Sequence, residues 1–378
     1  MMTCMDRYLL RSFLKSLLVC FFSLAGLFVI VDLFTNLDEF IALGERAGGL
    51  WPVLSQYYGA RILAFFERTS GILALIAAMF TITWLQRHNE MTALLAAGIS
   101  KARITKPIVV VVALISLLSV LNRELVLPSF QNRLARNAQD WHGEKGVRLN
   151  ARYDHETHIL IRGKETFDNQ QMISQPNFRL PPTFYAFARN LSGEVAYYQV
   201  ANQERPGGYL FKKIDPSVPL TGVPSAVLKG RTIIYSPHDT SWLREDQCFV
   251  VSNVDFSQLR NNNRAQQFAS TASLIAGLRN PGVEYGSRVR VLIHKRFVRP
   301  ILDMTLLFLG LPLVLTGTQR NVYIAIGTCF LLVAGFSILV IFCHGLGNQY
   351  LITPVLSVWL PVAIFVPVAA AVSQPLFE

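Results

Sequence analysis

Residues 321–377 contain no Asp, Glu, Lys or Arg, and His344 is the only histidine among them. A helix needs about 20 apolar residues to cross the hydrocarbon core of a bilayer. The uncharged tract is therefore long enough for two membrane helices. In the whole chain, 52% of residues are hydrophobic and only 16% are charged. This composition excludes a disordered chain and an ordinary soluble enzyme.

Four further apolar stretches have the length of a membrane helix. They are centred on residues 13–34, 69–86, 107–122 and 304–318. The sequence thus predicts six transmembrane helices, three before and three after a central segment of different character. The net charge of +11 is gathered in a few segments and leaves long tracts bare. Because these segments lie between the predicted membrane helices, we attribute the positive charge to the membrane topology and expect no nucleic-acid partner.

The distribution of basic residues predicts the orientation in the membrane. One set of alternating segments holds eight Lys and Arg, namely Arg7, Arg11, Lys15, Arg87, Lys101, Arg103, Lys106 and Arg320. The opposite short loops hold only Arg46. By the positive-inside rule, both termini are expected in the cytoplasm and the large central segment on the opposite side of the membrane.

The central segment has the pattern of strands and turns. Short apolar runs alternate there with Gly, Pro, Asn and Asp, and the candidate strands are residues 158–161, 193–200, 209–214, 232–235 and 249–253. Their spacing predicts an antiparallel sandwich or a jelly roll.

The expected fold is an α-helical integral membrane protein with an inserted all-β, jelly-roll-like domain between helices three and four, on the side of the membrane opposite the termini. Residues 1–127 would hold membrane helices one to three. Residues 128–290 would form the β-rich domain, and residues 291–378 would hold helices four to six.

The segment between helices two and three has the pattern of a short capped helix over residues 89–98. Asn89 is placed to cap its first turn, and Gly98 to take the left-handed conformation that ends it. Met91, Leu94 and Leu95 fall on one apolar face. Such a face either lies on the lipid interface or inserts into a groove on a cytoplasmic partner. The pattern by itself leaves both interpretations open.

Charged residues near the expected outer ends of the first two membrane helices are candidates for substrate contact. Arg61 and Arg68 are seven residues apart and share a helix face. Asp32 is the first charge of helix one after the bare run 16–31. Charges at this depth are costly unless they face protein, water or an anionic head group. The two arginines are therefore interfacial anchors or ligands for lipid phosphates.

Other charged residues at these helix ends are expected to pair internally. Arg123 and Glu124 end helix three, whereas Arg299 and Asp303 open helix four and are four residues apart. A spacing of four places two side chains on one helix face.

Motifs for enzymatic chemistry are weak in this sequence. A phosphate-binding loop would need Ser or Thr after Gly163-Lys164, but Glu165 follows. The zinc pattern H-E-x-x-H, starting at His155, would need a second histidine where Ile159 stands. We therefore expect no nucleotide site, cofactor or metal in this chain.

Three blocks of the sequence resemble the lipopolysaccharide export permease family, the LptF/LptG type. Residues 90–100, EMTALLAAGIS, resemble the family's E-x-T-A-L-x-A-A-G-I-S segment. Residues 292–300 and 308–313 resemble its entry into helix four, and Asp6-Arg7-Tyr8 resembles its usual start.

This resemblance implies a permease subunit of an ABC transporter that extracts lipopolysaccharide or a related glycolipid from the bacterial inner membrane. It implies a second LptF/LptG-like permease, an LptB-like ATPase dimer that hydrolyses the ATP, and LptC/LptA-like proteins that bridge the periplasm. The segment between helices two and three would be the coupling helix that receives motion from the ATPase. Its candidate coupling residues are Glu90, Met91, Thr92, Leu94, Leu95, Ala97 and Gly98.

Two other functions remain possible on the sequence. The chain is either the permease of another ABC exporter, such as a lipoprotein or peptide exporter, or a membrane-anchored scaffold whose periplasmic domain binds a partner. The block at residues 90–100 favours the lipopolysaccharide permease over both.

Overall fold

The computed structural model describes residues 4–136, 146–202, 205–215, 220, 222–259, 263–279, 287–316 and 322–374. The chain divides into two compact units. The helical unit comprises residues 1–131, 268–271 and 286–378, and the β unit comprises residues 132–267 and 272–285. Arg320, which entered the orientation argument, lies outside the described residues.

Six long helices of the helical unit are apolar enough to cross a membrane. They are α1 (Cys4–Thr35), α3 (Leu50–Arg87), α5 (Lys101–Leu121), α10 (Ser287–Thr316), α11 (Val322–Asn348) and α12 (Pro354–Ser373). The prediction of six membrane helices is confirmed for the described part of the chain. The apolar runs underestimated the lengths of α1, α3 and α10, because these helices continue through charged residues beyond the runs.

Short elements connect these helices. They are α2 (Leu37–Ala47), α4 (Glu90–Ala96), a π-helical turn η1 (Asn122–Val126), a 3-10 turn η2 (Leu127–Phe130) and α6 (Gln131–Ala135). The hydroxyl of Ser100 caps α5 by accepting a hydrogen bond from the backbone N–H of Arg103 at 3.3 Å. Gly48, in a left-handed conformation, ends α2.

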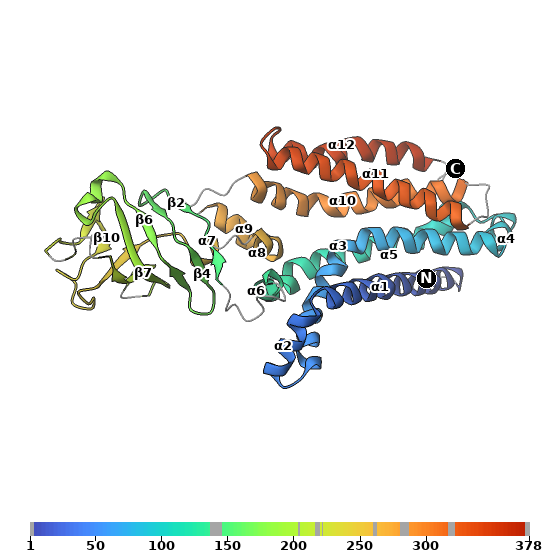
Figure 1. The fold of residues 1–378 in the computed structure, drawn as a ribbon. Coiled ribbons are helices and arrows are strands. Elements are labelled where there is room, and N and C mark those ends of the chain that lie inside the picture. The colour runs from blue at the N-terminus through green and yellow to red at the C-terminus, as the bar shows by residue number, and fades with distance from the viewer. Residues whose placement is uncertain are drawn as a thin grey trace. The chain divides into compact units, whose positions relative to one another are not determined.

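The start of α1, the segment α4 and the described end of α12 lie at one end of the helical unit (Figure 1). We call this the α4 end and the other the opposite end. Leu9 and Phe13 of α1 are fully buried in the core of the unit. Ala74, Ala77 and Ala78 of α3 are buried in the same core, and such small residues allow helices to approach closely.

The described residues of the β unit form eleven strands. They are β1 (Val147–Arg148), β2 (Arg152–Asp154), β3 (Ile159–Ile161), β4 (Glu165–Phe167), β5 (Met172–Ser174), β6 (Asn177–Arg179), β7 (Asn190–Gln199), β8 (Gly208–Ile214), β9 (Ala226–Leu228), β10 (Arg231–Tyr235) and β11 (Gln247–Val251). All pairings among the described strands are antiparallel. The β-rich central region is thus confirmed, and each of the five predicted strands overlaps one of these.

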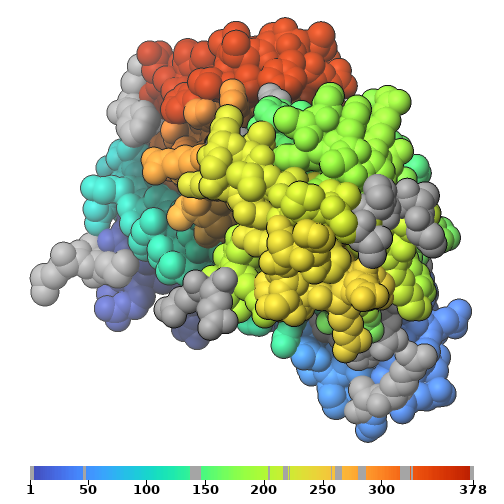
Figure 2. Space-filling view, turned by 90° about the vertical axis from the view of Figure 1, so that its left-hand side faces the viewer, coloured from blue at the N-terminus to red at the C-terminus, as the bar shows by residue number. Residues whose placement is uncertain are grey.

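The longest strand, β7, organises the β unit. The main sheet has the order β1-β4-β5-β7-β8-β11-β10-β9, and β2, β3 and β6 join it through β7. Phe178, Tyr209, Phe211 and Phe249 are fully buried aromatic residues of this unit. The turns and helices η4 (Pro182–Phe187), α7 (Phe256–Leu259), α8 (Asn263–Phe268) and α9 (Thr271–Leu278) complete the described chain. The surface coloured green to yellow in Figure 2 belongs to this unit.

Candidate functional site

The predicted coupling segment forms a helix shorter than the expected range of residues 89–98. The helix α4 covers Glu90–Ala96 and is followed by Gly98 with a φ of 81°, as the sequence predicted. Asn89 does not cap it as expected. Its backbone adopts a left-handed φ of 59°, and its side chain makes no capping hydrogen bond. The turn before α4 is therefore shaped by the conformation of Asn89 and not by its side chain.

The apolar residues of α4 do not form a face exposed to solvent, and this corrects the sequence interpretation. Met91 is only 5% exposed and packs into the core of the helical unit, with Leu94 partly buried against it. Leu95 is 39% exposed. Thr92, Ala93, Ala96, Ala97 and Gly98 are also exposed. The surface that α4 offers to a partner thus consists of small residues and Leu95.

Two polar contacts join α1 to the chain around α4. The Tyr8 hydroxyl donates to the Glu90 carboxylate, at 2.9 Å from Oε2 and 3.1 Å from Oε1. Arg103, near the start of α5, donates to Asp6 Oδ2 at 3.2 Å. The position of Glu90 is therefore set partly by α1, which lies 82 residues away in sequence.

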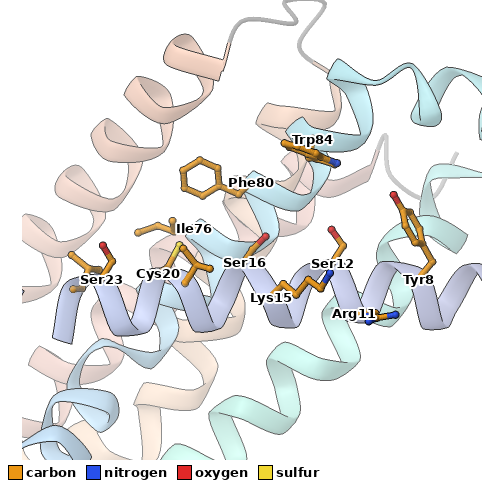
Figure 3. Close-up of a pocket in the computed structure, with 12 residues that line it drawn as sticks. Tyr8, Arg11, Ser12, Lys15, Ser16, Cys20, Ser23, Ile76, Phe80 and Trp84 are labelled. Carbon is orange, nitrogen blue, oxygen red and sulfur yellow. The ribbon is translucent and has the colours of Figure 1, made fainter. Parts of the chain in front are cut away.

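A pocket of about 750 Å³ opens between α1 and α3 beside the Tyr8–Glu90 contact. Arg11 and Lys15 of α1 line it together with four small polar residues, Ser12, Ser16, Cys20 and Ser23. Ile76, Phe80 and Trp84 face it from α3 (Figure 3). A spacing of four residues along α3 places these three side chains in one stripe. The sequence analysis did not anticipate this pocket, because its two walls are more than 50 residues apart in sequence.

The three residues proposed as substrate contacts do not share one environment. Asp32 Oδ2 accepts a hydrogen bond from the Tyr58 hydroxyl at 2.9 Å, which joins α1 to α3. The Arg61 guanidinium lies 3.9 Å from the centre of the Tyr57 ring and is partly buried. Arg68 is exposed and makes no hydrogen bond or ion pair with a described residue. Of these residues, Arg68 is the one most available to a ligand.

A cluster of buried charges lies inside the helical unit. Arg299 Nη1 of α10 is 2.9 Å from Glu67 Oε1 of α3, and Arg123 Nη1 of the π turn is 3.7 Å from the same oxygen. Arg299 also lies 4.0 Å from Asp303, the intrahelical pair that the sequence predicted. The side chains of Glu67 and Arg123 are only 15% and 8% exposed. Glu67 therefore connects α3 to both the π turn and α10.

Glu124 extends this cluster to the first residue of α9. Its carboxylate accepts hydrogen bonds from the backbone N–H and the hydroxyl of Thr271, at 2.8 and 2.7 Å. Arg296 Nη1 lies 3.8 Å from Glu124 Oε1, and its side chain is 3% exposed. Among the described residues, the ion pairs of this cluster join three arginines to three carboxylates. This balance allows charges to lie within apolar helices, where an unpaired charge would be costly.

The Asp154-to-His158 segment of the β unit has a structural role. Asp154 is fully buried and accepts hydrogen bonds from the Ser252 hydroxyl at 2.6 Å and the Asn253 backbone N–H at 3.1 Å. Its other carboxylate oxygen accepts from the backbone N–H of Glu156 at 3.0 Å. These bonds hold the turn between β2 and β3 against the chain that follows β11.

Six helices that are long and apolar enough to span a membrane, together with an inserted β unit, define a multi-pass membrane protein. The family described as lipopolysaccharide export system permease LptF/LptG matches residues 7–147 and 231–374. The chain belongs to this family. The unmatched residues in between, 148–230, hold the strands β2 to β9. No curated protein has a sequence that matches this chain.

Proposed function

We propose that this chain is one of two permease subunits of an ABC transporter that extracts lipopolysaccharide or a related glycolipid from the inner membrane. A separate, LptB-like ATPase dimer hydrolyses the ATP, and LptC/LptA-like proteins receive the lipid in the periplasm. Membership of the LptF/LptG family supports the lipopolysaccharide permease. The partners and the coupling are our inference.

In this proposal, the α4 end of the helical unit faces the cytoplasm and the β unit faces the periplasm. The positive-inside count supports the orientation, because basic residues lie in the first turns of α1 and on both sides of α4. The helix α4 then meets the ATPase through the surface formed by Thr92, Leu95 and Ala97, together with the Glu90 carboxylate. Met91 and Leu94 anchor α4 in the helical unit, so that a displacement of α4 is passed to α3 and α5.

One observation supports the coupling role: one side of α4 is exposed, and the other is buried in the core of the helical unit. Leu95 and its small neighbours are free to dock, while Met91 is buried in the core of the membrane helices. A loop helix that merely rested on lipid would turn its apolar residues outward. The anchored helix instead suits a rigid connection between a partner and the membrane helices.

Purification from the native membrane tests the proposal. The tagged chain is extracted in mild detergent, and the proteins and lipids that co-purify are identified by mass spectrometry. An ATPase, a second permease and a phosphorylated glycolipid are expected together. Recovery of the chain alone, or with periplasmic proteins only, would contradict the proposal and favour a scaffold.

The position of Arg68 suggests a sharper test of substrate contact. Arg68→Gln removes an exposed cation, whereas Arg61→Gln removes one that already stacks on Tyr57. If Arg68 binds lipid phosphate, Arg68→Gln lowers the lipid-stimulated ATPase activity of the complex without changing its assembly. Equal stimulation in the wild type and in Arg68→Gln would remove Arg68 from the substrate site.

A further inference from the structure

The pocket between α1 and α3 has the chemistry of a lipid site. Arg11 and Lys15 line it near the start of α1, and its lining residues include no acid. Neither cation makes a hydrogen bond or an ion pair with a described residue. Each is also exposed. Two adjacent basic side chains are thus available to an anion at this end of the pocket.

The position of these cations along α1 places them at a membrane boundary. Arg11 precedes Asp32 by 21 residues, which corresponds to about 31 Å at a rise of 1.5 Å per residue. This length matches the roughly 30 Å of the hydrocarbon core. With Asp32 at one boundary, Arg11 lies at the other, and Lys15 lies one helical turn deeper. A lysine at that depth extends its ammonium group back to the interface.

Apart from four small polar residues of α1, Ser12, Ser16, Cys20 and Ser23, the rest of the pocket lining is mainly apolar. Val19, Phe80 and Trp84 line it and are 69%, 39% and 54% exposed. Figure 3 shows Phe80 and Trp84 above the α1 residues Cys20 and Ser12, with Arg11 and Lys15 toward the same end as Tyr8. A volume of about 750 Å³ lies within the range of small-molecule sites, roughly 300–1,000 Å³. The pocket therefore presents a cationic end and an apolar body.

We propose that this pocket binds an anionic phospholipid, with its phosphate between Arg11 and Lys15 and an acyl chain along Val19, Phe80 and Trp84. Guanidinium and ammonium groups bind phosphate oxygens well at a partly desolvated boundary. A transmembrane helix of another protein in the same place would leave both cations unpaired unless it brought acids into the membrane. The lipid satisfies both parts of the pocket at once.

In the proposed orientation, this phospholipid belongs to the cytoplasmic leaflet, and that assignment rests on the proposed function. The binding of the lipid itself does not, because the pocket is formed by this chain alone. The test below therefore measures lipid binding without the ATPase, so that its failure is separate from a failure of the export proposal.

The experiment uses the full chain, purified and delipidated in mild detergent, and native mass spectrometry. Phosphatidylglycerol is expected to bind with a stoichiometry of one at concentrations where phosphatidylcholine does not. The double variant Arg11→Gln/Lys15→Gln is expected to bind phosphatidylglycerol about tenfold more weakly. The matched control Lys101→Gln/Lys106→Gln removes two basic residues at the same end of the unit but outside the pocket, and it should bind as the wild type does.

A charge-preserving variant keeps the test decisive if the double variant is poorly folded. Arg11→Lys/Lys15→Arg retains both cations and should retain the preference for phosphatidylglycerol. Equal binding by the wild type and Arg11→Gln/Lys15→Gln, with both proteins folded, would overturn the proposal. So would loss of the preference in Arg11→Lys/Lys15→Arg while that protein is folded, because the site would then not be defined by charge.

Photo-crosslinking identifies the occupant in the native membrane. A photoreactive amino acid at position 19 faces the apolar body of the pocket. A crosslinked phospholipid is expected. A crosslink to a polypeptide in its place would show that a protein helix fills the pocket and would also overturn the proposal.

Discussion

The carboxylate of Asp303 on α10 occupies the space that a Cβ atom on Gly71 of α3 would take. A Cβ atom built on Gly71 overlaps Oδ1 and Cγ of Asp303 and lies 3.1 Å from its Cβ. This absence of a side chain lets the two helices meet beside the buried charge cluster. The packing of the charge cluster therefore requires glycine at position 71.

Gly71→Ala is expected to destabilise the helical unit by about 1–3 kcal/mol, the usual cost of overpacking. Thermal unfolding of the purified chain in detergent measures the effect as a lower Tm. Gly59→Ala is the matched control, because Gly59 lies on the same helix and a Cβ there meets nothing within 4 Å. Equal Tm values for the two variants would show that α3 and α10 do not pack as described.

Substitutions at Met91 and Leu95 should affect different properties of the protein, its stability at Met91 and its association with the ATPase at Leu95. Met91→Ala removes a buried side chain and is expected to cost about 2–5 kcal/mol. Leu95→Glu changes an exposed position and should leave the Tm unchanged while abolishing association with the ATPase. Thermal unfolding and co-purification of the ATPase measure the two effects. A destabilised Leu95→Glu variant would contradict the exposure of this residue.

Tyr8→Phe should weaken coupling without weakening assembly. The substitution removes the hydroxyl that donates to Glu90, and a hydrogen bond to a charged group contributes about 1.5–3 kcal/mol. Because Tyr8 is 47% exposed, we expect the lower end of this range or less. The ATPase activity of the complex should fall roughly three- to tenfold. Tyr185→Phe, an exposed tyrosine of the β unit, is the control and should retain full activity.

The Glu67–Arg299 pair is expected to show a favourable coupling energy of about 1–3 kcal/mol in a double-mutant cycle. Both side chains are mostly buried, at 15% and 21% exposed. Either single substitution to Gln removes the closest partner of the remaining charge and leaves only a longer contact, Glu67 with Arg123 at 3.7 Å or Arg299 with Asp303 at 4.0 Å. Thermal unfolding of the two single variants and the double variant provides the measurement. If the single effects add without interaction, the contact does not stabilise the unit.

The β unit should lose local stability in acid through Asp239. The Ser225 hydroxyl and backbone N–H donate to this carboxylate and hold its pKa below the ordinary value of 3.8. A lowered pKa stabilises the fold above pH values near 4, and the contribution is lost as the pH falls through the folded value. The hydrogen-exchange protection factors of residues 225–239, which are corrected for the intrinsic pH dependence of exchange, should therefore fall below about pH 4. In Asp239→Asn, these protection factors should already be lower at neutral pH and respond less to acid.

The membrane helices could be predicted from the sequence because each needs a long apolar run, and such runs are visible without a structure. Their true ends were not predictable in this way. The helix α3 begins at Leu50, well before the apolar run at residue 69, because residues 50–68 mix aromatic and charged side chains. The six three-residue strands, β2 to β6 and β9, are too short to show alternation.

Sequence periodicity predicted the helix between the second and third membrane helices but not which way its apolar residues face. The spacing of Met91, Leu94 and Leu95 shows that they share a face, yet it cannot show whether that face turns toward the protein or away from it. The contact between Tyr8 and Glu90 spans 82 residues, so no local pattern predicts it. The intrahelical pair of Arg299 and Asp303 was predictable from its spacing, whereas the role of Glu67 was not, because its partners lie on other helices.

Tyr8 connects the α1–α3 pocket to α4, because it lines the pocket and its hydroxyl donates a hydrogen bond to Glu90. Two ligands that meet at one side chain obey thermodynamic reciprocity. If a lipid in the pocket changes the affinity of the α4 surface for a partner by some factor, the partner changes the affinity of the pocket for that lipid by the same factor. The lipid composition of the membrane around α1 would then act as an allosteric effector of the ATPase that binds the α4 surface.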